Sequence, residues 1–134
     1  MKTLLWLDDV RNPSENGWLN FSPIGKDVKV IWIKSYDEFV YFINEEPLPD
    51  AICFDHDLGE RDYTVWMDYA GMSKEEALEY ISDGEKTGYD CAKYLIDMCI
   101  VTGSKLPLYN IQSANPVGKE NIKYLLENYK KHYE

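Results

Sequence analysis

Short apolar runs that alternate with helical patterns are the feature that most constrains the fold of this chain. The runs cover residues 1–7, 28–33, 51–54 and 108–112. Apolar residues at helical spacing follow the last three runs, beginning near Ser35, Thr87 and Pro116. Such alternation favours a parallel sheet, because each strand must be joined to the next by a crossover. The pattern predicts an α/β three-layer sandwich whose doubly wound parallel sheet has the flavodoxin-like strand order 2-1-3-4.

One segment, Glu60 to Lys86, interrupts this alternation. Ser73 and Glu76 within it have capping-box spacing, and Trp66 is one of several aromatic residues there. We interpret residues 60–86 as an insertion after the third strand that lies beside the rim of the sheet. The whole chain of 134 residues is long enough for one domain with a real core, and we predict a single receiver-like domain over residues 1–134.

Composition excludes several classes of protein. The formal net charge is -10 and the isoelectric point is near 4.6, which argues against general binding to duplex DNA. It does not exclude a small phosphate ligand held at a metal. No apolar run approaches the ~18 residues of a membrane span, and no signal peptide precedes the first predicted strand. Because Cys53, Cys91 and Cys99 lie in apolar patterns, we expect reduced core cysteines and a cytoplasmic location.

Two acidic clusters follow two of the apolar runs directly. Asp8 and Asp9 come after the first run, and Asp55 and Asp57 flank His56 after the third. Ligands bind at the carboxyl ends of strands in such sheets, so the clusters are expected to share one cleft. Crowded carboxylates require a cation or partial protonation, and carboxylate oxygens suit Mg²⁺. The prediction is a Mg²⁺ site with Asp9 and Asp55 as ligands and Asp8 acting through water. The alternative is that these aspartates are ordinary turn residues at the ends of the strands.

Further polar residues are candidates for the same cleft. His56 is a candidate general acid or base, and with Asp57 and Arg11 it completes the predicted catalytic set. Arg11 is a surface residue, an intramolecular partner of Asp57 or a bidentate phosphate clamp. Ser113 and Asn115, after the fourth run, either cap the last helix or donate hydrogen bonds to a phosphoryl oxygen. Arg11, Ser113 and Asn115 form the predicted substrate-binding set.

Four motifs together resemble the cyclic-phosphate processing receiver domain family, a divergent branch of the receiver fold. They are Leu7–Pro13 (LDDVRNP), Phe54–Gly59 (FDHDLG), Thr87–Asp90 (TGYD) and Gln112–Pro116 (QSANP). The resemblance runs in order along nearly the whole chain, with the segment after Gly59 more variable. It implies a metal-supported pocket that acts on cyclic phosphates, either RNA ends with a 2′,3′-cyclic phosphate or cyclic nucleotides.

This chain departs from the pattern of its relatives in two places. Ordinary receivers carry a lysine after a fifth strand, and here the sequence stops before such a strand. Members of the resembled family often have His where Gln112 stands; if that His is a proton donor, this chain would be slow or inactive. Two alternatives to a phosphoesterase therefore stay open. One is a signalling receiver phosphorylated on Asp55, and the other is a non-catalytic module that binds a nucleotide or a protein partner.

Overall fold

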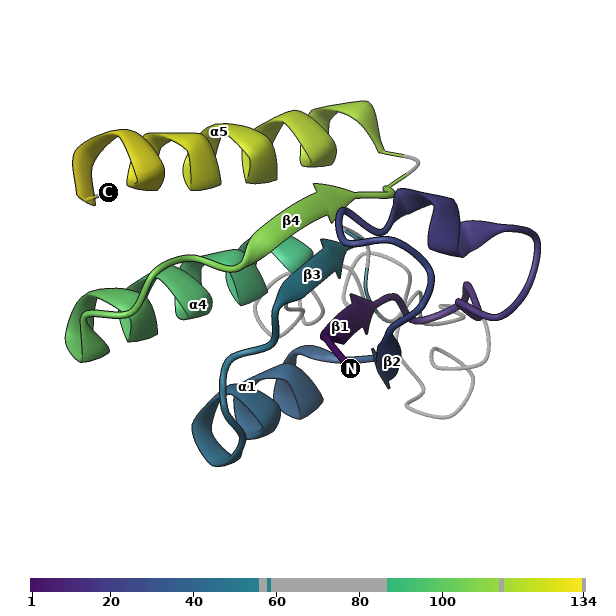
Figure 1. The fold of residues 1–134 in the computed structure, drawn as a ribbon. Coiled ribbons are helices and arrows are strands. Elements are labelled where there is room, and N and C mark those ends of the chain that lie inside the picture. The colour runs from purple at the N-terminus through teal and green to yellow at the C-terminus, as the bar shows by residue number, and fades with distance from the viewer. Residues whose placement is uncertain (56–57, 59–86, 114, 134) are drawn as a thin grey trace, which may run out of the picture.

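The computed structural model describes residues 1–55, 58, 87–113 and 115–133, and Figure 1 shows their arrangement. The predicted insertion at 60–86 lies outside the described residues. His56 and Asp57, two of the predicted catalytic residues, also lie outside them.

A four-stranded sheet forms the centre of the molecule. Its strands are β1 (Thr3–Leu7), β2 (Lys29–Ile33), β3 (Ala51–Phe54) and β4 (Leu108–Ile111). They are parallel and lie in the order β2-β1-β3-β4, which confirms the predicted flavodoxin-like order with the first strand inside the sheet. Leu7 is in register with Ile33 and with Phe54, so these three strands end level with one another. Whatever follows β1 and β3 therefore emerges side by side at one rim.

In the described part of the chain, three α-helices cover one face of the sheet. They are α1 (Tyr36–Glu45), α4 (Gly88–Thr102) and α5 (Pro116–Tyr133), with α4 in contact with both of the others. Local sequence sets where they begin: the Ser35 Oγ accepts a hydrogen bond from the backbone N–H of Glu38, and Thr87 and Asp90 form a capping box. Alternate strand residues supply the sheet side of this core, including Leu5, Leu7, Ile52 and Phe54.

The opposite face of the sheet is covered by a loop segment. The strand residues pointing this way include Leu4, Trp6, Ala51 and Cys53, and the side chains that cover them come from residues 18–28. This segment contains the 3₁₀ turn η1 (Trp18–Phe21), which Gly17 opens at a φ of 70°. The Asn110 Nδ2 donates to the Phe21 carbonyl at 2.8 Å and ties the loop to β4. Because Asn, Gly and Pro residues that favour turns recur in this loop, no long helix forms here.

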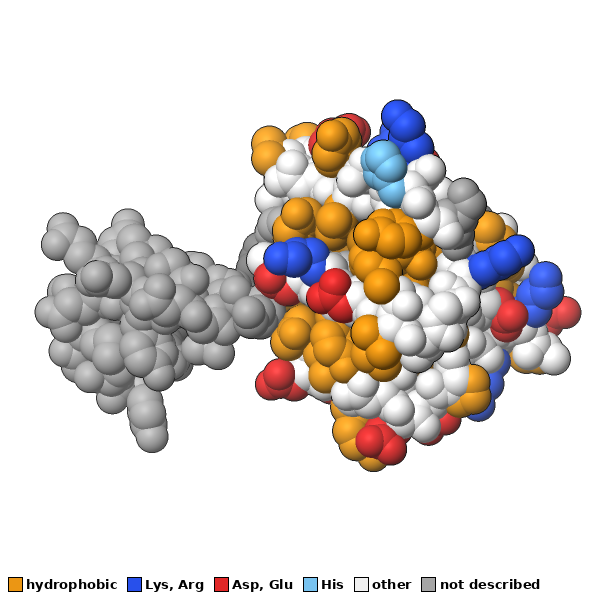
Figure 2. All heavy atoms as spheres, turned by 90° about the vertical axis from the view of Figure 1, so that its left-hand side faces the viewer, with side chains coloured by type: hydrophobic (Ala, Val, Ile, Leu, Met, Phe, Trp, Pro, Cys, Tyr) orange, Lys and Arg blue, Asp and Glu red, His pale blue; other side chains and the backbone are white. Residues whose placement is uncertain are grey.

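A groove lies at the end of the molecule opposite the carboxyl rim. It has a volume of about 420 Å³ and lies between the C-terminal ends of α4 and α5, lined by Cys99, Ile100 and Tyr129 among others. Figure 2 faces this end, where hydrophobic side chains gather between scattered charged ones. No helix in the described part of the chain is long and apolar enough to cross a membrane.

Candidate metal centre

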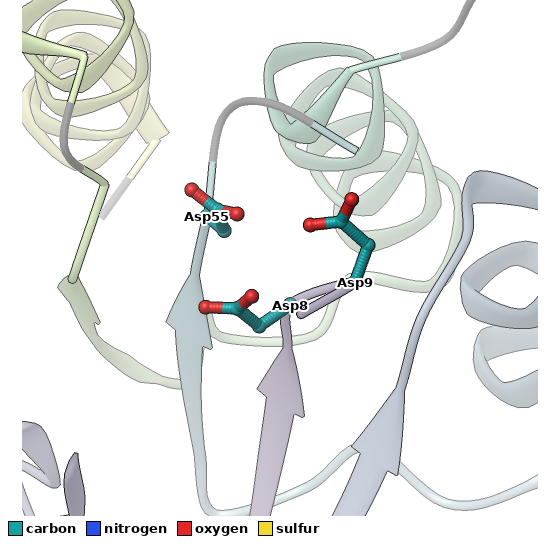
Figure 3. A group of neighbouring side chains, drawn as sticks. All are labelled: Asp8, Asp9 and Asp55. Carbon is teal, nitrogen blue, oxygen red and sulfur yellow. The ribbon is translucent and has the colours of Figure 1, made fainter. Parts of the chain in front are cut away.

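Three carboxylates converge at the carboxyl rim of the sheet. Asp8 and Asp9 follow β1 and Asp55 follows β3, and Figure 3 shows their side chains turned toward one another. Each offers one oxygen, and these oxygens all lie within 4.8 Å of one another. Asp8 is 1% exposed and Asp55 is 6% exposed, whereas Asp9 is half-buried. The sheet register explains the convergence, because the backbone N–H of Asp55 still bonds to the carbonyl of Leu7 at 2.9 Å.

The two oxygens of Asp8 have different surroundings. Its Oδ1 accepts hydrogen bonds from the backbone N–H groups of Val10 and Arg11, at 3.0 and 2.9 Å. This is the turn role that sequence allowed for an aspartate at the end of a strand. Its Oδ2 is buried and has no hydrogen-bond partner. One carboxylate thus shapes the turn with one oxygen and presents the other to the acidic cluster.

Two indole groups fix the backbone of this turn. The Trp6 Nε1 donates to the carbonyl of Arg11 at 2.9 Å, and the Trp32 Nε1 donates to the carbonyl of Asp8 at 2.7 Å. Trp6 lies in β1 and Trp32 lies in β2, and both pack in the apolar cluster on the loop-covered face of the sheet. The sequence pattern did not place them at the site, because aromatic residues in apolar runs are usually core residues. The only signal in the sequence was a polar N–H on a buried residue, which requires a partner.

Arg11 lies half-buried at this rim. Its Nη1 donates to the backbone carbonyl of Gln112 at 2.7 Å and faces Asp8 Oδ2 at 3.5 Å and Asp55 Oδ1 at 3.8 Å. Its guanidinium carbon lies 4.9 Å from the centre of the Trp18 ring. Of the three interpretations offered for Arg11, the intramolecular one describes these contacts. The partners are Asp8 and Asp55, while the expected partner Asp57 lies outside the described residues.

Ser113 and Asn115 make the contacts expected of helix caps. The Ser113 Oγ accepts from the backbone N–H of Asn115 at 3.1 Å, and the Asn115 Oδ1 accepts from the backbone N–H of Gly118 at 3.0 Å. These bonds satisfy amide groups at the start of α5. Both residues follow β4 at the same rim as the carboxylates. Their role in binding substrate stays a prediction.

Gln112 is the second residue at this rim with an unsatisfied buried atom. It is 4% exposed, and its Nε2 donates to the carbonyl of Leu7 at 3.0 Å. Its Oε1 has no hydrogen-bond partner. Among the described residues, this atom and Asp8 Oδ2 are the two buried side-chain polar atoms without one. Unsatisfied buried groups of this kind often mark a place where an ion, a water or a ligand binds.

The donor set fits the predicted Mg²⁺. It consists of carboxylate oxygens alone, and Mg²⁺ prefers oxygen ligands. Zinc sites, by contrast, usually contain nitrogen or sulfur ligands. Asp8 belongs to this set, and its buried Oδ2 has no hydrogen-bond partner, as expected of an oxygen beside a cation site. Asp8, Asp9 and Asp55 are thus brought together as the sequence predicted.

Comparisons with known proteins place this arrangement in a family. Residues 3–128 match the model of the cyclic-phosphate processing receiver domain. The chain therefore belongs to the cyclic-phosphate processing receiver domain family, as its motifs had indicated. No curated protein matches it.

Solved structures resemble the chain more distantly. One is a fusion of the yeast Spc42 trimeric coiled coil to another structure, with 18% identity and a TM-score of 0.53. That match covers 92% of this chain, but the chain spans only 60% of the length of the fusion. Another is a CheY-like response regulator receiver domain from Methanospirillum hungatei JF-1, with 19% identity, 98% coverage of both chains and a TM-score of 0.35.

Proposed function

We propose that this protein is a Mg²⁺-supported phosphoesterase that opens cyclic phosphates, either on RNA ends or in cyclic nucleotides. The observation that carries the proposal is the convergence of Asp8, Asp9 and Asp55, with one buried carboxylate oxygen lacking a hydrogen bond. Membership of the cyclic-phosphate processing family supports the class of substrate. Opening a cyclic phosphate consumes one water: its oxygen bonds to phosphorus, one ring P–O bond breaks, and the leaving oxygen takes up a proton.

The metal would be held by Asp9 and Asp55, with Asp8 acting through water. When bound, Mg²⁺ supplies positive charge that polarises a phosphoryl oxygen. The guanidinium of Arg11 lies beside the same carboxylates and would stabilise the negative charge that develops on the phosphate oxygens. The Asn115 amide, at the start of α5, would contribute a further polar contact.

Proton transfer falls to His56 in this proposal. His56 follows the metal ligand Asp55 directly in sequence and is the one histidine near the rim motifs, since His132 lies at the far end of α5. It would accept a proton from the attacking water or give one to the leaving oxygen. Gln112 does not titrate and so offers no alternative. Replacing His56 with Asn should lower the rate by about 100-fold or more.

A substrate panel tests the proposal. Purified protein is incubated with 2′,3′-cyclic nucleotides, 3′,5′-cyclic nucleotides and RNA ending in a cyclic phosphate, in Mg²⁺ and in EDTA. We expect Mg²⁺-dependent formation of a phosphomonoester from at least one of them, lost in Asp55→Asn. The matched control is Asp50→Asn, because Asp50 lies just before the amino-terminal end of β3, away from the acidic cluster, and its carboxylate accepts a hydrogen bond from the exposed backbone N–H of Thr3. Turnover that survives Asp55→Asn would overturn the proposed mechanism.

If no substrate in the panel is cleaved, the result favours the non-catalytic module instead. In that case Gln112→His is the next variant to assay, because it restores the residue that family members often carry. If Gln112→His turns over a cyclic phosphate and the natural sequence does not, the pocket is that of an esterase lacking its proton donor. If both are inactive while a cyclic nucleotide binds, the protein senses the ligand without cleaving it.

A further inference from the structure

We infer that Arg11 is a built-in counter-ion of the acidic cluster, and that it exchanges between the carboxylates and a bound phosphate when a divalent cation enters. The inference rests on the proposed function, since it assumes that the cation binds among Asp8, Asp9 and Asp55. It adds an order of events to that site: the cation first, then the phosphate.

The geometry shows why the two cations compete. Arg11 Nη1 faces Asp8 Oδ2 at 3.5 Å and Asp55 Oδ1 at 3.8 Å, and both carboxylates belong to the group that would hold the metal. The Oδ2 of Asp8 has no hydrogen bond, so within the described part of the chain its negative charge is compensated by the ion pair with Arg11. A divalent ion bound to these carboxylates would take over that compensation and repel the guanidinium.

The contacts of Arg11 also show that it can leave. Both carboxylates lie beyond the usual hydrogen-bond distance, so charge attracts the guanidinium to them without a directed bond. Among the described residues, the guanidinium makes one hydrogen bond, to the backbone carbonyl of Gln112 at 2.7 Å. The side chain is 22% exposed and lies against the face of Trp18, so part of it already meets solvent. An arginine displaced by a few ångströms from this position presents a planar donor group to an incoming phosphate.

The test compares Arg11→Gln with a matched control, Lys34→Gln. Lys34 also carries a positive charge over a tryptophan ring, 4.2 Å from the centre of Trp32, but it follows β2 and no ion pair joins it to the cluster among the described residues. Mg²⁺ affinity is measured by titration calorimetry, and melting temperature is measured in EDTA and in saturating Mg²⁺. Inorganic phosphate serves as the probe for the anion.

Removing the competitor should tighten metal binding. We expect Arg11→Gln to bind Mg²⁺ about 10-fold more tightly than wild type, whereas Lys34→Gln should change it by less than about twofold. Arg11→Gln should lower the melting temperature in EDTA and recover most of that loss in Mg²⁺. In Mg²⁺ it should bind inorganic phosphate about 10-fold more weakly than wild type. Arg11→Lys, which keeps the charge, should leave Mg²⁺ affinity near the wild-type value.

Distinct results separate the failure of this inference from the failure of the proposed site. If wild type and Arg11→Gln bind Mg²⁺ equally, and the loss of melting temperature is the same in EDTA and in Mg²⁺, Arg11 is a structural residue and the exchange is refuted. If neither protein binds Mg²⁺, the metal site itself is refuted. Tighter binding in Arg11→Gln with unchanged phosphate affinity would refute the second half of the exchange.

Discussion

Replacing Gln112 with Met should leave the free energy of unfolding unchanged or raise it slightly. Gln112 is buried, and its amide has one satisfied and one unsatisfied end. Met has nearly the same length and volume, so the change removes the polar group with little loss of packing. The carbonyl of Leu7 loses the bond from Gln112 but keeps the one from the backbone N–H of Asp55, at 2.9 Å.

The magnitude follows from these contacts. The lost hydrogen bond contributes about 1 kcal/mol, and removing a buried oxygen without a partner relieves about 1–3 kcal/mol of desolvation. The expected change is therefore between about 0 and +2 kcal/mol in the free energy of unfolding. Gln112→Ala makes a useful contrast, because it leaves a cavity and should cost about 2 kcal/mol.

Urea denaturation in EDTA measures both variants, with equal slopes showing that the unfolded state is not altered. A loss of more than about 2 kcal/mol in Gln112→Met would refute the reasoning, because it would show that the Oε1 atom has a partner that stabilises the fold. An unchanged or higher free energy of unfolding would show that the side-chain amide of Gln112 is not needed for folding. Its role would then be at the carboxyl rim of the sheet.

Two further predictions concern the helix caps and the cysteines. Asn115→Ala and Ser35→Ala should each cost about 1 kcal/mol in urea denaturation, because each removes a side-chain acceptor from the start of a helix, but only Asn115→Ala should also weaken phosphate binding. Equal phosphate affinity in the two variants would show that Asn115 caps α5 and does not bind phosphate. Burial raises the pKa of the Cys53 thiol from 9.0 to about 12, so the unfolded chain loses this proton first. The contribution of the protonated thiol to the free energy of unfolding is complete below pH 9.0 and should decline as pH rises toward 12. Urea denaturation midpoints across that pH range measure the decline. In Cys53→Ala, the part of the decline that comes from this thiol should be absent.

The order of the strands and the meeting of the two acidic clusters were predictable from sequence. Apolar runs of strand length, each followed by a helical pattern, leave few topologies, and right-handed crossovers then bring the ends of the first and third strands together. Asp8 and Asp55 follow those strands directly, so their proximity needed no knowledge of side-chain conformation. The turn-rich composition of residues 8–23 likewise predicted a short or irregular element there.

The contacts of Arg11 were not predictable in the same way. They depend on the register that brings the end of β4 level with the ends of β3 and β1, so that the Gln112 carbonyl lies 2.7 Å from the guanidinium across 101 positions of sequence. The indole bonds of Trp6 and Trp32 also depend on which way each ring turns within its strand. Sequence patterns specify the face on which a residue lies, and packing then decides which atom it meets.

Calorimetric titration of Mg²⁺ decides whether Asp8, Asp9 and Asp55 hold a cation, on which both the phosphoesterase and the exchange of Arg11 depend. Wild type and the control Asp50→Asn should bind one Mg²⁺ with equal affinity, and Asp55→Asn should bind it at least about 10-fold more weakly, since it removes one ligand charge. The melting temperature of wild type should rise with Mg²⁺ in the same series. Absence of binding to wild type at millimolar Mg²⁺, or equal affinity in Asp55→Asn, would contradict the account.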